Sequence, residues 1–390
     1  MCQTELVLLV VTMALQASPS LGQEASIGSK GSFAGEPTQA AHVLRGHKYP
    51  VGAVAISPDM KSIASGGGEN KEPRGQGITT FSVKELNDLT RGEGMVWDVK
   101  TAKRKAILQP APGNVIGLSF NNNGKVIGGC LRNSPYAGGR PQHPTVVFWD
   151  ATKGKVANQY LGLNTPEALS FSADGKVVVV AGGFRDPDTI TTGPFGQNAL
   201  VQNPKHGNVI RLMQYPALKV IQQIDIVGKN SGAMYTDSRY VAYHEGQTVH
   251  IVDITTGKET TVIPEATVGA MRISPDGKVL ALLGENRSEK HSLQFLSVET
   301  GAAIGNPAFV VSTWSKAYAF SADSKWLAIA TGWAGDESLI CLWNIAERKE
   351  IARYVGHVGN VSSLAFSGDG SFLVSGGIDK TVRIWKLPAK

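Results

Sequence analysis

The chain repeats one short pattern of apolar and polar positions along most of its length. An alternating apolar segment leads into a polar turn of the form Ser/Asn-x-Asp/Asn, often followed by Gly, and a second apolar segment follows. Six clear copies and one degenerate copy of this segment and turn occupy residues 54–59, 118–124, 169–175, 233–238, 271–277, 319–324 and 364–370. Because such turns between apolar segments are a strong signal for β-hairpins, each copy predicts a hairpin.

A third apolar segment ends, in most copies, in Trp-Asp or a related pair. The pairs are Trp97-Asp98, Trp149-Asp150, Val252-Asp253, Trp343-Asn344 and Trp385-Lys386. The last copy is the most complete, because Gly356-His357 also precedes its first strand. These motifs resemble the WD40 repeat family, whose unit of about 40–45 residues has Gly-His near its start and Trp-Asp near its end. The resemblance covers about residues 41–390.

The resemblance implies an all-β fold, a single seven-bladed β-propeller. A ring of sheets must hide its own seam, since an unpaired strand edge would otherwise remain. In WD40-like propellers a strand from the beginning of the chain completes the last blade. We therefore expect residues 41–45, directly before Gly46-His47, to pair with residues 380–387.

The first 40 residues differ from the repeats that follow. The apolar run Leu6–Leu15 is too short to span a bilayer but fits the core of a signal peptide, with a possible cut before Gln23. The n-region departs from the usual pattern, because it contains Glu5 and neither Lys nor Arg. We expect a signal peptide at 1–22, a linker at 23–40 and a propeller at 41–390. The product would be secreted or periplasmic, or cytoplasmic if the apolar run is not a signal peptide.

Composition narrows the class of protein. With 42% hydrophobic and 18% charged residues the chain can bury a large core, which excludes global disorder. The net charge of +6 is scattered, and the densest basic run, residues 100–105, has no interleaved aromatic residues, so nucleic-acid binding is not predicted. The three cysteines lack CxxC spacing, so we expect no zinc site and no cofactor. We further expect no membrane span and a monomer.

Three polar residues of the last copy, Ser375, His357 and Asp379, have the residue types of a hydrolase triad, and Trp385 lies in the same copy. In WD40 proteins the matching side chains form a buried hydrogen-bond chain that ties the strands of a blade together. The resemblance therefore implies a structural staple rather than a catalytic site. The first copy retains His47 and Trp97, but an insertion replaces its tight turn and leaves the fourth member open.

Blades one to three contain extra residues between their second and third strands, at about 66–94, 129–144 and 182–208. In a propeller these loops share one face, and insertions in repeat proteins often form a binding face. Residues 82–85 also match a capping box, which predicts a short helix in the first insertion. Arg and aromatic residues are enriched as interface anchors, so the candidates for a partner-binding face are Arg132, Tyr136, Arg140, Phe184, Arg185, Phe195 and Trp333. Loop padding that packs on itself is the competing interpretation.

The preferred function is a non-catalytic scaffold that mediates protein–protein interaction through these loops. The alternative is a Ca²⁺-assisted, lactonase-like propeller hydrolase with a site at the mouth of the central channel. The residues expected there are Asn114, Glu167, Asn230, Lys316 and Asn360. One carboxylate is few for a cation that prefers 6 to 8 oxygen ligands, and a lysine would oppose it. P-loop, GxSxG and HExxH motifs are absent, and the identity of a partner stays open.

Overall fold

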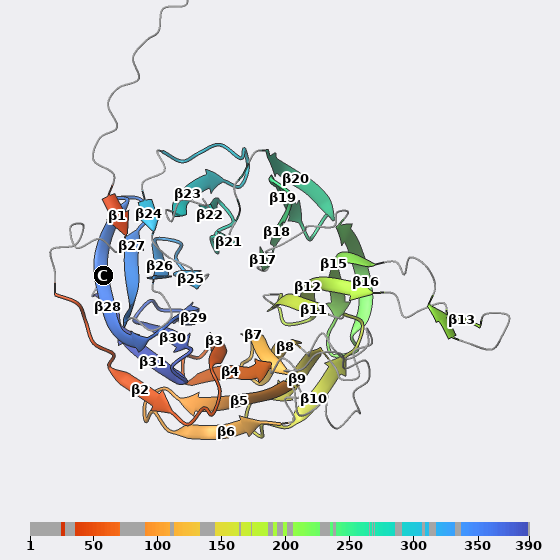
Figure 1. Cartoon of the computed structure of the whole chain (residues 1–390), viewed down its shortest axis with the longest axis horizontal. Coiled ribbons are helices and arrows are strands. Elements are labelled where there is room, and N and C mark those ends of the chain that lie inside the picture. The colour runs from red at the N-terminus through yellow and green to blue at the C-terminus, as the bar shows by residue number, and fades with distance from the viewer. Residues whose placement is uncertain are drawn as a thin grey trace, which may run out of the picture.

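The computed structural model describes most of the chain outside its N-terminus and several loops. The described residues are 25–27, 36–70, 90–109, 113–132, 145–163, 165–172, 174–185, 190–192, 198–200, 206–226, 235–236, 239–264, 266, 268, 270–284, 291–305, 309–311, 317–331 and 337–388. They form seven sheets arranged as blades around a central axis and one separate two-stranded sheet, and none of these residues is helical (Figure 1). The predicted all-β, seven-bladed propeller is confirmed.

Each of the first three blades is an antiparallel sheet whose first strand lies nearest the axis (Figure 1). Blade one contains β3 (Val51–Ile56), β4 (Ser62–Asn70), β5 (Thr90–Asp98) and β6 (Arg104–Leu108). Blade two contains β7 (Asn114–Phe120), β8 (Val126–Arg132), β9 (Val146–Asp150) and β10 (Val156–Tyr160). Blade three contains β11 (Thr165–Phe171), β12 (Val177–Arg185), β15 (His206–Gln214) and β16 (Lys219–Ile226). A separate two-stranded hairpin, β13 (Ile190–Thr192) and β14 (Asn198–Leu200), lies between β12 and β15 in the chain.

The remaining blades follow the same order. Blade four contains β17 (Tyr235–Thr236), β18 (Tyr240–Glu245), β19 (Thr248–Asp253) and β20 (Lys258–Ile263). Blade five contains β21 (Ala270–Ile273), β22 (Val279–Gly284), β23 (His291–Ser297) and β24 (Phe309–Val311). Blade six contains β25 (Tyr318–Phe320), β26 (Trp326–Thr331), β27 (Glu337–Asn344) and β28 (Lys349–Val358). Blade seven contains β29 (Val361–Phe366), β30 (Phe372–Gly377), β31 (Thr381–Lys386) and β2 (His42–Arg45).

Blade seven is completed from the N-terminal side of the chain, as expected. Strand β2 pairs antiparallel with β31, and the register places His42 opposite Ile384 and Arg45 opposite Thr381. Leu44 of this short strand is buried in the core between blades seven and one. The two ends of the propeller sequence therefore share one sheet, which removes the open seam.

The segment before β2 also contacts the outside of the ring. Strand β1 (Ala25–Ile27) pairs in parallel with β24, the outer strand of blade five. Thr38 forms a parallel bridge with Tyr354 on the outer strand of blade six. Residues 23–40 were expected to be a linker, but two parts of this segment pair with blades five and six. The chain then enters blade seven as β2 (Figure 1).

The repeated Ser-x-Asp turn has a local cause. In blade one the Ser57 hydroxyl donates to Asp59 Oδ1 at 2.6 Å, while the amide N–H groups of Lys61 and Ser62 donate to Asp59 and Ser57. The same set of bonds recurs in the corresponding turns of blades three, five, six and seven. The turn therefore satisfies its own backbone donors, which explains why the motif recurs.

The tryptophans of the Trp-Asp position fill the spaces between blades. Trp97, Trp149, Trp343 and Trp385 are all buried, and each packs against the preceding blade around the ring. Trp385, for example, lies in one apolar cluster with Ala352 and Tyr354 of blade six. Truncating a buried tryptophan costs about 3–5 kcal/mol, so this one repeat position contributes strongly to the cohesion of the ring.

The insertions of blades one to three begin later than the sequence pattern indicates. Strands β4 and β5 stay paired as far as Asn70 and Thr90, and β12 and β15 stay paired as far as Arg185 and His206. In blade two, β8 likewise continues to Arg132. The ends of the predicted insertions are thus strand, because each loop continues the ladder of its blade. The predicted helix near residue 82 lies outside the described residues.

Candidate functional site

The loops between the second and third strands of each blade share one face with the connections that lead into the next blade. In blade one, β4 and β5 remain paired on this face. Beyond the Gly67–Glu93 pair, Glu69 lies directly opposite Arg91. Both side chains are exposed. The corresponding strands of blade seven are six residues each, against nine in blade one. The first insertion is therefore held on a rigid, extended base.

The structure places only part of the predicted partner-binding face. Arg132 is exposed at the end of β8, opposite Asn114 of β7. The backbone of Phe184 and Arg185 lies at the end of β12, opposite Gly207 and His206. The other four candidates, Tyr136, Arg140, Phe195 and Trp333, lie outside the described residues. The three placed residues all end second strands on the same face of the disc.

Two residues expected at the channel mouth share an unusual property. The side-chain Oδ1 atoms of Asn114 and Asn360 are buried and receive no hydrogen bond from any described residue. Glu167 is exposed, whereas Asn230 and Lys316 lie outside the described part of the chain. The neighbouring Val51, Val115 and Val361 are buried in the core, so they do not line an open mouth.

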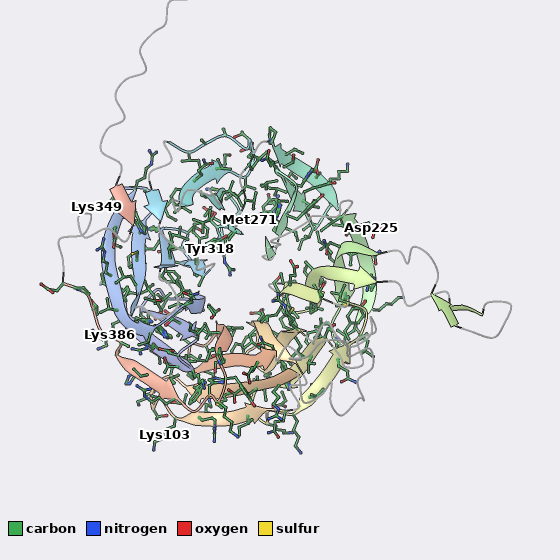
Figure 2. All side chains as sticks on the ribbon, in the orientation of Figure 1. Lys103, Asp225, Met271, Tyr318, Lys349 and Lys386 are labelled. Carbon is green, nitrogen blue, oxygen red and sulfur yellow. The ribbon has the colours of Figure 1, made fainter. Side chains whose placement is uncertain are left out.

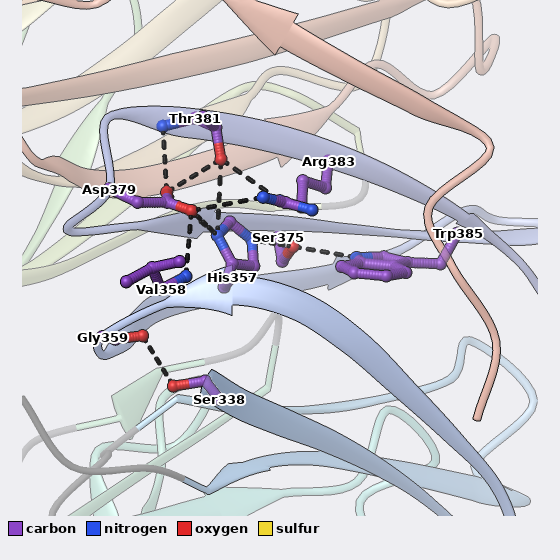
Figure 3. A network of polar contacts seen from close by, with 9 residues as sticks. All are labelled: Ser338, His357, Val358, Gly359, Ser375, Asp379, Thr381, Arg383 and Trp385. Atoms are coloured by element: carbon purple, nitrogen blue, oxygen red, sulfur yellow. Dashed lines mark hydrogen bonds and ion pairs between the residues drawn. The ribbon is translucent and has the colours of Figure 1, made fainter. Parts of the chain in front are cut away.

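In blade seven the structure brings together His357, Ser375, Asp379 and Trp385, the set that we call the staple (Figure 3). Trp385 Nε1 donates to Ser375 Oγ at 2.8 Å, and Ser375 Oγ lies 2.7 Å from His357 Nε2. His357 Nδ1 lies 2.9 Å from Asp379 Oδ2. Because indole is only a donor and the ionised carboxylate only an acceptor, each hydroxyl and ring nitrogen between them donates one bond toward Asp379.

Asp379 collects more donors than the histidine alone. Its carboxylate accepts bonds from the Val358 amide and from both the amide and the hydroxyl of Thr381, and Arg383 Nη2 lies 3.5 Å away (Figure 3). Burial opposes ionisation of Asp379, but the bonds from His357 and Thr381 outweigh it. The pKa of this carboxyl therefore lies well below its ordinary value.

Blade one builds the same staple with a different fourth member. His47 Nε2 and Trp97 Nε1 both lie 2.7 Å from Ser65 Oγ, and His47 Nδ1 lies 3.0 Å from Glu93 Oε1. The same Glu93 oxygen accepts the amide N–H groups of Lys48 and Tyr49. Burial raises the pKa of Glu93 but these bonds outweigh it, so the net pKa is lowered. The fourth member left open by the sequence is Glu93.

Sequence reasoning missed Glu93 because it fell inside the predicted insertion. Asp379 precedes the third strand of its blade, whereas Glu93 lies on the third strand itself, four residues before Trp97. A search for a carboxylate on the third strand, wherever an insertion removes the tight turn, would have found it. Thr381 and Arg383 were also missed, because their role depends on contacts across β31 and not on a motif.

This geometry does not suit nucleophilic catalysis. Ser375 is fully buried, and its oxygen already accepts a bond from Trp385, so no substrate can reach it. Ser65 of blade one is equally buried and bonded. Both sets instead tie the histidine that precedes a blade to the second and third strands of that blade.

The described residues contain no group of three His, Cys, Asp or Glu side chains placed to hold a metal ion. Cys130 and Cys341 are free and buried. Burial, together with the nearby Glu167, raises the pKa of the Cys130 thiol to about 12. Burial also raises the pKa of Cys341. Both thiols are therefore protonated and unreactive at neutral pH.

A closed ring of seven antiparallel blades, tied by His-Ser-Trp-carboxylate networks, defines a WD40-type β-propeller. The family described as "WD domain, G-beta repeat" matches residues 38–71 and 348–386, which are the segments that carry the two staple histidines. Two segments of the chain therefore match WD40 repeats, and the sheets around them form the seven blades of a propeller.

Curated relatives agree with this assignment. A 292-residue stretch is 21% identical to the serine-threonine kinase receptor-associated protein of Dictyostelium discoideum and covers 70% of this chain and 95% of that protein. The chain is 25% identical over 179 residues to eukaryotic translation initiation factor 3 subunit I of Culex quinquefasciatus, covering 44% of this chain and 55% of the relative. A 72-residue stretch, 18% of the chain, is 40% identical to the ROOT INITIATION DEFECTIVE 3 protein of Arabidopsis thaliana but spans only 16% of that protein.

Proposed function

We propose that this protein is a non-catalytic scaffold that binds protein partners through the face carrying the insertions of blades one to three. The observation that carries the proposal is that the β4–β5 and β12–β15 ladders continue into the predicted insertions, so that paired strands present both of them. Two of the relatives are named as a receptor-associated protein and as a subunit of an initiation factor. Those names describe proteins that work within assemblies, which supports the same class of function here.

The predicted face is tested by comparing complexes captured by two loop variants. In the first, residues 71–89 are replaced by a short Gly-Ser turn and Arg132→Glu is added. In the control, Lys103→Glu changes a charge on the turn between the third and fourth strands, at the outer rim (Figure 2). We expect the first variant, but not the control, to lose partners that the full chain retains from lysate of the source organism. Equal capture by both variants would refute this face as the binding surface.

The hydrolase alternative rests on the Oδ1 atoms of Asn114 and Asn360, which could coordinate a cation or accept a hydrogen bond from water. A Ca²⁺ site there would make the melting temperature rise with added Ca²⁺ and fall with chelator, because a ligand that binds only the folded state stabilises it. We propose that the melt is insensitive to both. A shift that disappears in an Asn114→Ala and Asn360→Ala double variant would favour the hydrolase.

We further propose export with a cut before Gln23 and no interaction with nucleic acid. None of the described residues forms a helix with the length and apolar character needed to cross a bilayer. N-terminal sequencing of the protein purified from its source tests the cut directly. An N-terminus at or before Met1 in the mature protein would contradict it.

A further inference from the structure

Blade three departs from the other blades at the turn between its third and fourth strands. In blades one, two and four this turn begins with an aspartate, Asp98, Asp150 or Asp253, whose carboxylate accepts backbone N–H groups. Blade three has Gln214 at the position of the aspartate, and Tyr215-Pro216-Ala217-Leu218 follow. Leu218 has a φ of 53°, the left-handed conformation that Ala102, Gly154 and Gly257 adopt at the same place in the other three turns. The turn is therefore apolar where its neighbours are polar.

The apolar character continues along the outer strand. Val220 is 36% exposed and Ile221 is 60% exposed, the highest value among the large exposed hydrophobic residues of the described chain. Strand β16 is eight residues long, and its outer edge pairs with no other described strand. Natural proteins normally protect such an edge, because it can template pairing with another chain.

The same molecule shows that the outer edge of a blade accepts an added strand. Strand β1 pairs with β24 of blade five, and Thr38 bridges to β28 of blade six. The described residues before β2 thus pair with blades five and six, and none of them pairs with blade three. The outer edge of β16 likewise lies at the end of its sheet, and it combines this with exposed apolar side chains.

We propose that β16 is a self-association edge, which pairs antiparallel with β16 of a second copy about a two-fold axis at Gln222. That register sets Lys219 opposite Asp225 of the second copy and Val220 opposite Ile224 of the second copy. Both pairs occur twice, because a two-fold interface is self-complementary. The charged pairs therefore lie at the two ends of the ladder and the Val220–Ile224 pairs lie inside them, while Gln222 faces Gln222 of the second copy at the centre, beside the bulge at Ile221.

The positions of these groups permit the pairing. Asp225 lies at the outer rim of the disc (Figure 2), where its carboxylate accepts a bond from the side chain of Gln223 on the same strand. Lys219 and Asp225 are both exposed. One pair of strands is smaller than a standard interface of about 1,600 Å², so we expect a weak, concentration-dependent dimer with a Kd on the order of micromolar to hundreds of micromolar. This departs from the monomer expected from the sequence.

Charge reversal tests the register by sedimentation velocity of the full chain over a wide range of concentration. Lys219→Glu alone, or Asp225→Lys alone, creates two like-charge pairs, and we expect each to weaken dimerisation about tenfold or more. The Lys219→Glu, Asp225→Lys double variant restores both attractive pairs and should dimerise like the wild type. Mixing the two single variants should also restore dimers, because every pair is then attractive.

Two further variants distinguish pairing at this edge from non-specific association through exposed apolar residues. Ile221→Lys adds charge at the most exposed apolar position and should abolish the dimer, while Val262→Lys makes the same change on β20 of blade four and should leave it intact. Thermal melts of all variants verify folding. A wild type that remains monomeric at high concentration, or a dimer unaffected by the single charge reversals, would overturn the proposal. Neither result would affect the proposed partner face, which lies on different loops.

Discussion

Blades one and seven solve the same problem with different carboxylates. In both, the histidine before the blade must be anchored through Nδ1, together with the backbone amides that follow it. Blade seven uses Asp379 from the tight turn between β30 and β31, and blade one uses Glu93 from within β5. The additional methylene of glutamate, and a position on the strand, let the first blade keep its staple although an insertion opens its turn. The network therefore constrains where donors and acceptors lie and does not fix which element supplies them.

The largest expected effect comes from removing part of blade seven altogether. Deleting residues 380–390 removes β31, including Trp385, and leaves β2 without its partner. We expect no cooperative thermal transition by circular dichroism. Deleting only residues 388–390 is the control and should leave the melt unchanged. A soluble product that melts cooperatively without residues 380–390 would disprove the closure.

Removing the serine hydroxyl at the centre of each staple should lower the free energy of unfolding by a similar amount in both blades. Ser375→Ala and Ser65→Ala each leave a buried indole N–H and a buried ring nitrogen without a partner, which costs about 2–4 kcal/mol. Denaturant unfolding measures both. Ser362→Ala, at an exposed position of β29, is the matched control and should change stability by less than about 0.5 kcal/mol. Unequal costs at Ser375 and Ser65 would show that the two networks differ in their centre as well.

Removing the charge of the carboxylate should destabilise the protein more in blade seven than in blade one. Asp379→Asn loses more charge-assisted bonds than Glu93→Gln, so we expect about 2–3 kcal/mol for the first and about 1–2 kcal/mol for the second. Urea unfolding at neutral pH provides the comparison. A larger cost at Glu93 would mean that the long side chain is the better anchor.

The pH dependence of unfolding sharpens the same contrast. Both carboxyl pKa values are lower in the folded state than their ordinary values of 3.8 for Asp379 and 4.5 for Glu93. Folding therefore favours the ionised form, and the stabilisation is fully present above the ordinary pKa and lost as the pH falls below about 5. We expect the Asp379→Asn and Glu93→Gln variants to lose less stability than the wild type between about pH 5 and pH 3. If the free energy of unfolding fell equally with pH in all three proteins, the two carboxylates would not be the source of the acid sensitivity.

The smallest effect is expected from the loop that opens the turn of blade one. Replacing residues 71–89 with a short Gly-Ser turn should change the stability by about 1 kcal/mol or less, because loop-closure entropy depends weakly on length. In that background Glu93→Gln should cost as much as in the full chain. A smaller cost would show that the insertion, and not β5, positions Glu93.

The sequence pattern predicts the repeated architecture well, because the Ser-x-Asp turns and buried tryptophans are local devices that recur in each blade. Strand β2 is predictable for the same reason, since it precedes the Gly46-His47 motif. Glu93 is not, because its role depends on β4 and β5 remaining paired inside a segment that looks like a loop. The three-residue strand β1 carries too short a pattern to predict a pairing with blade five.

Pairing of β2 with β31 can begin only after the rest of the propeller has been synthesised. His42 emerges from the ribosome long before its partner Ile384. At about 5–20 residues per second, β2 waits on the order of 20–70 s before its partner exists. During that interval the other blades can form against one another, but the ring cannot close. Synthesis of β31 is thus the last step that closure of the ring requires, and a ribosome that stops before β31 releases an open ring.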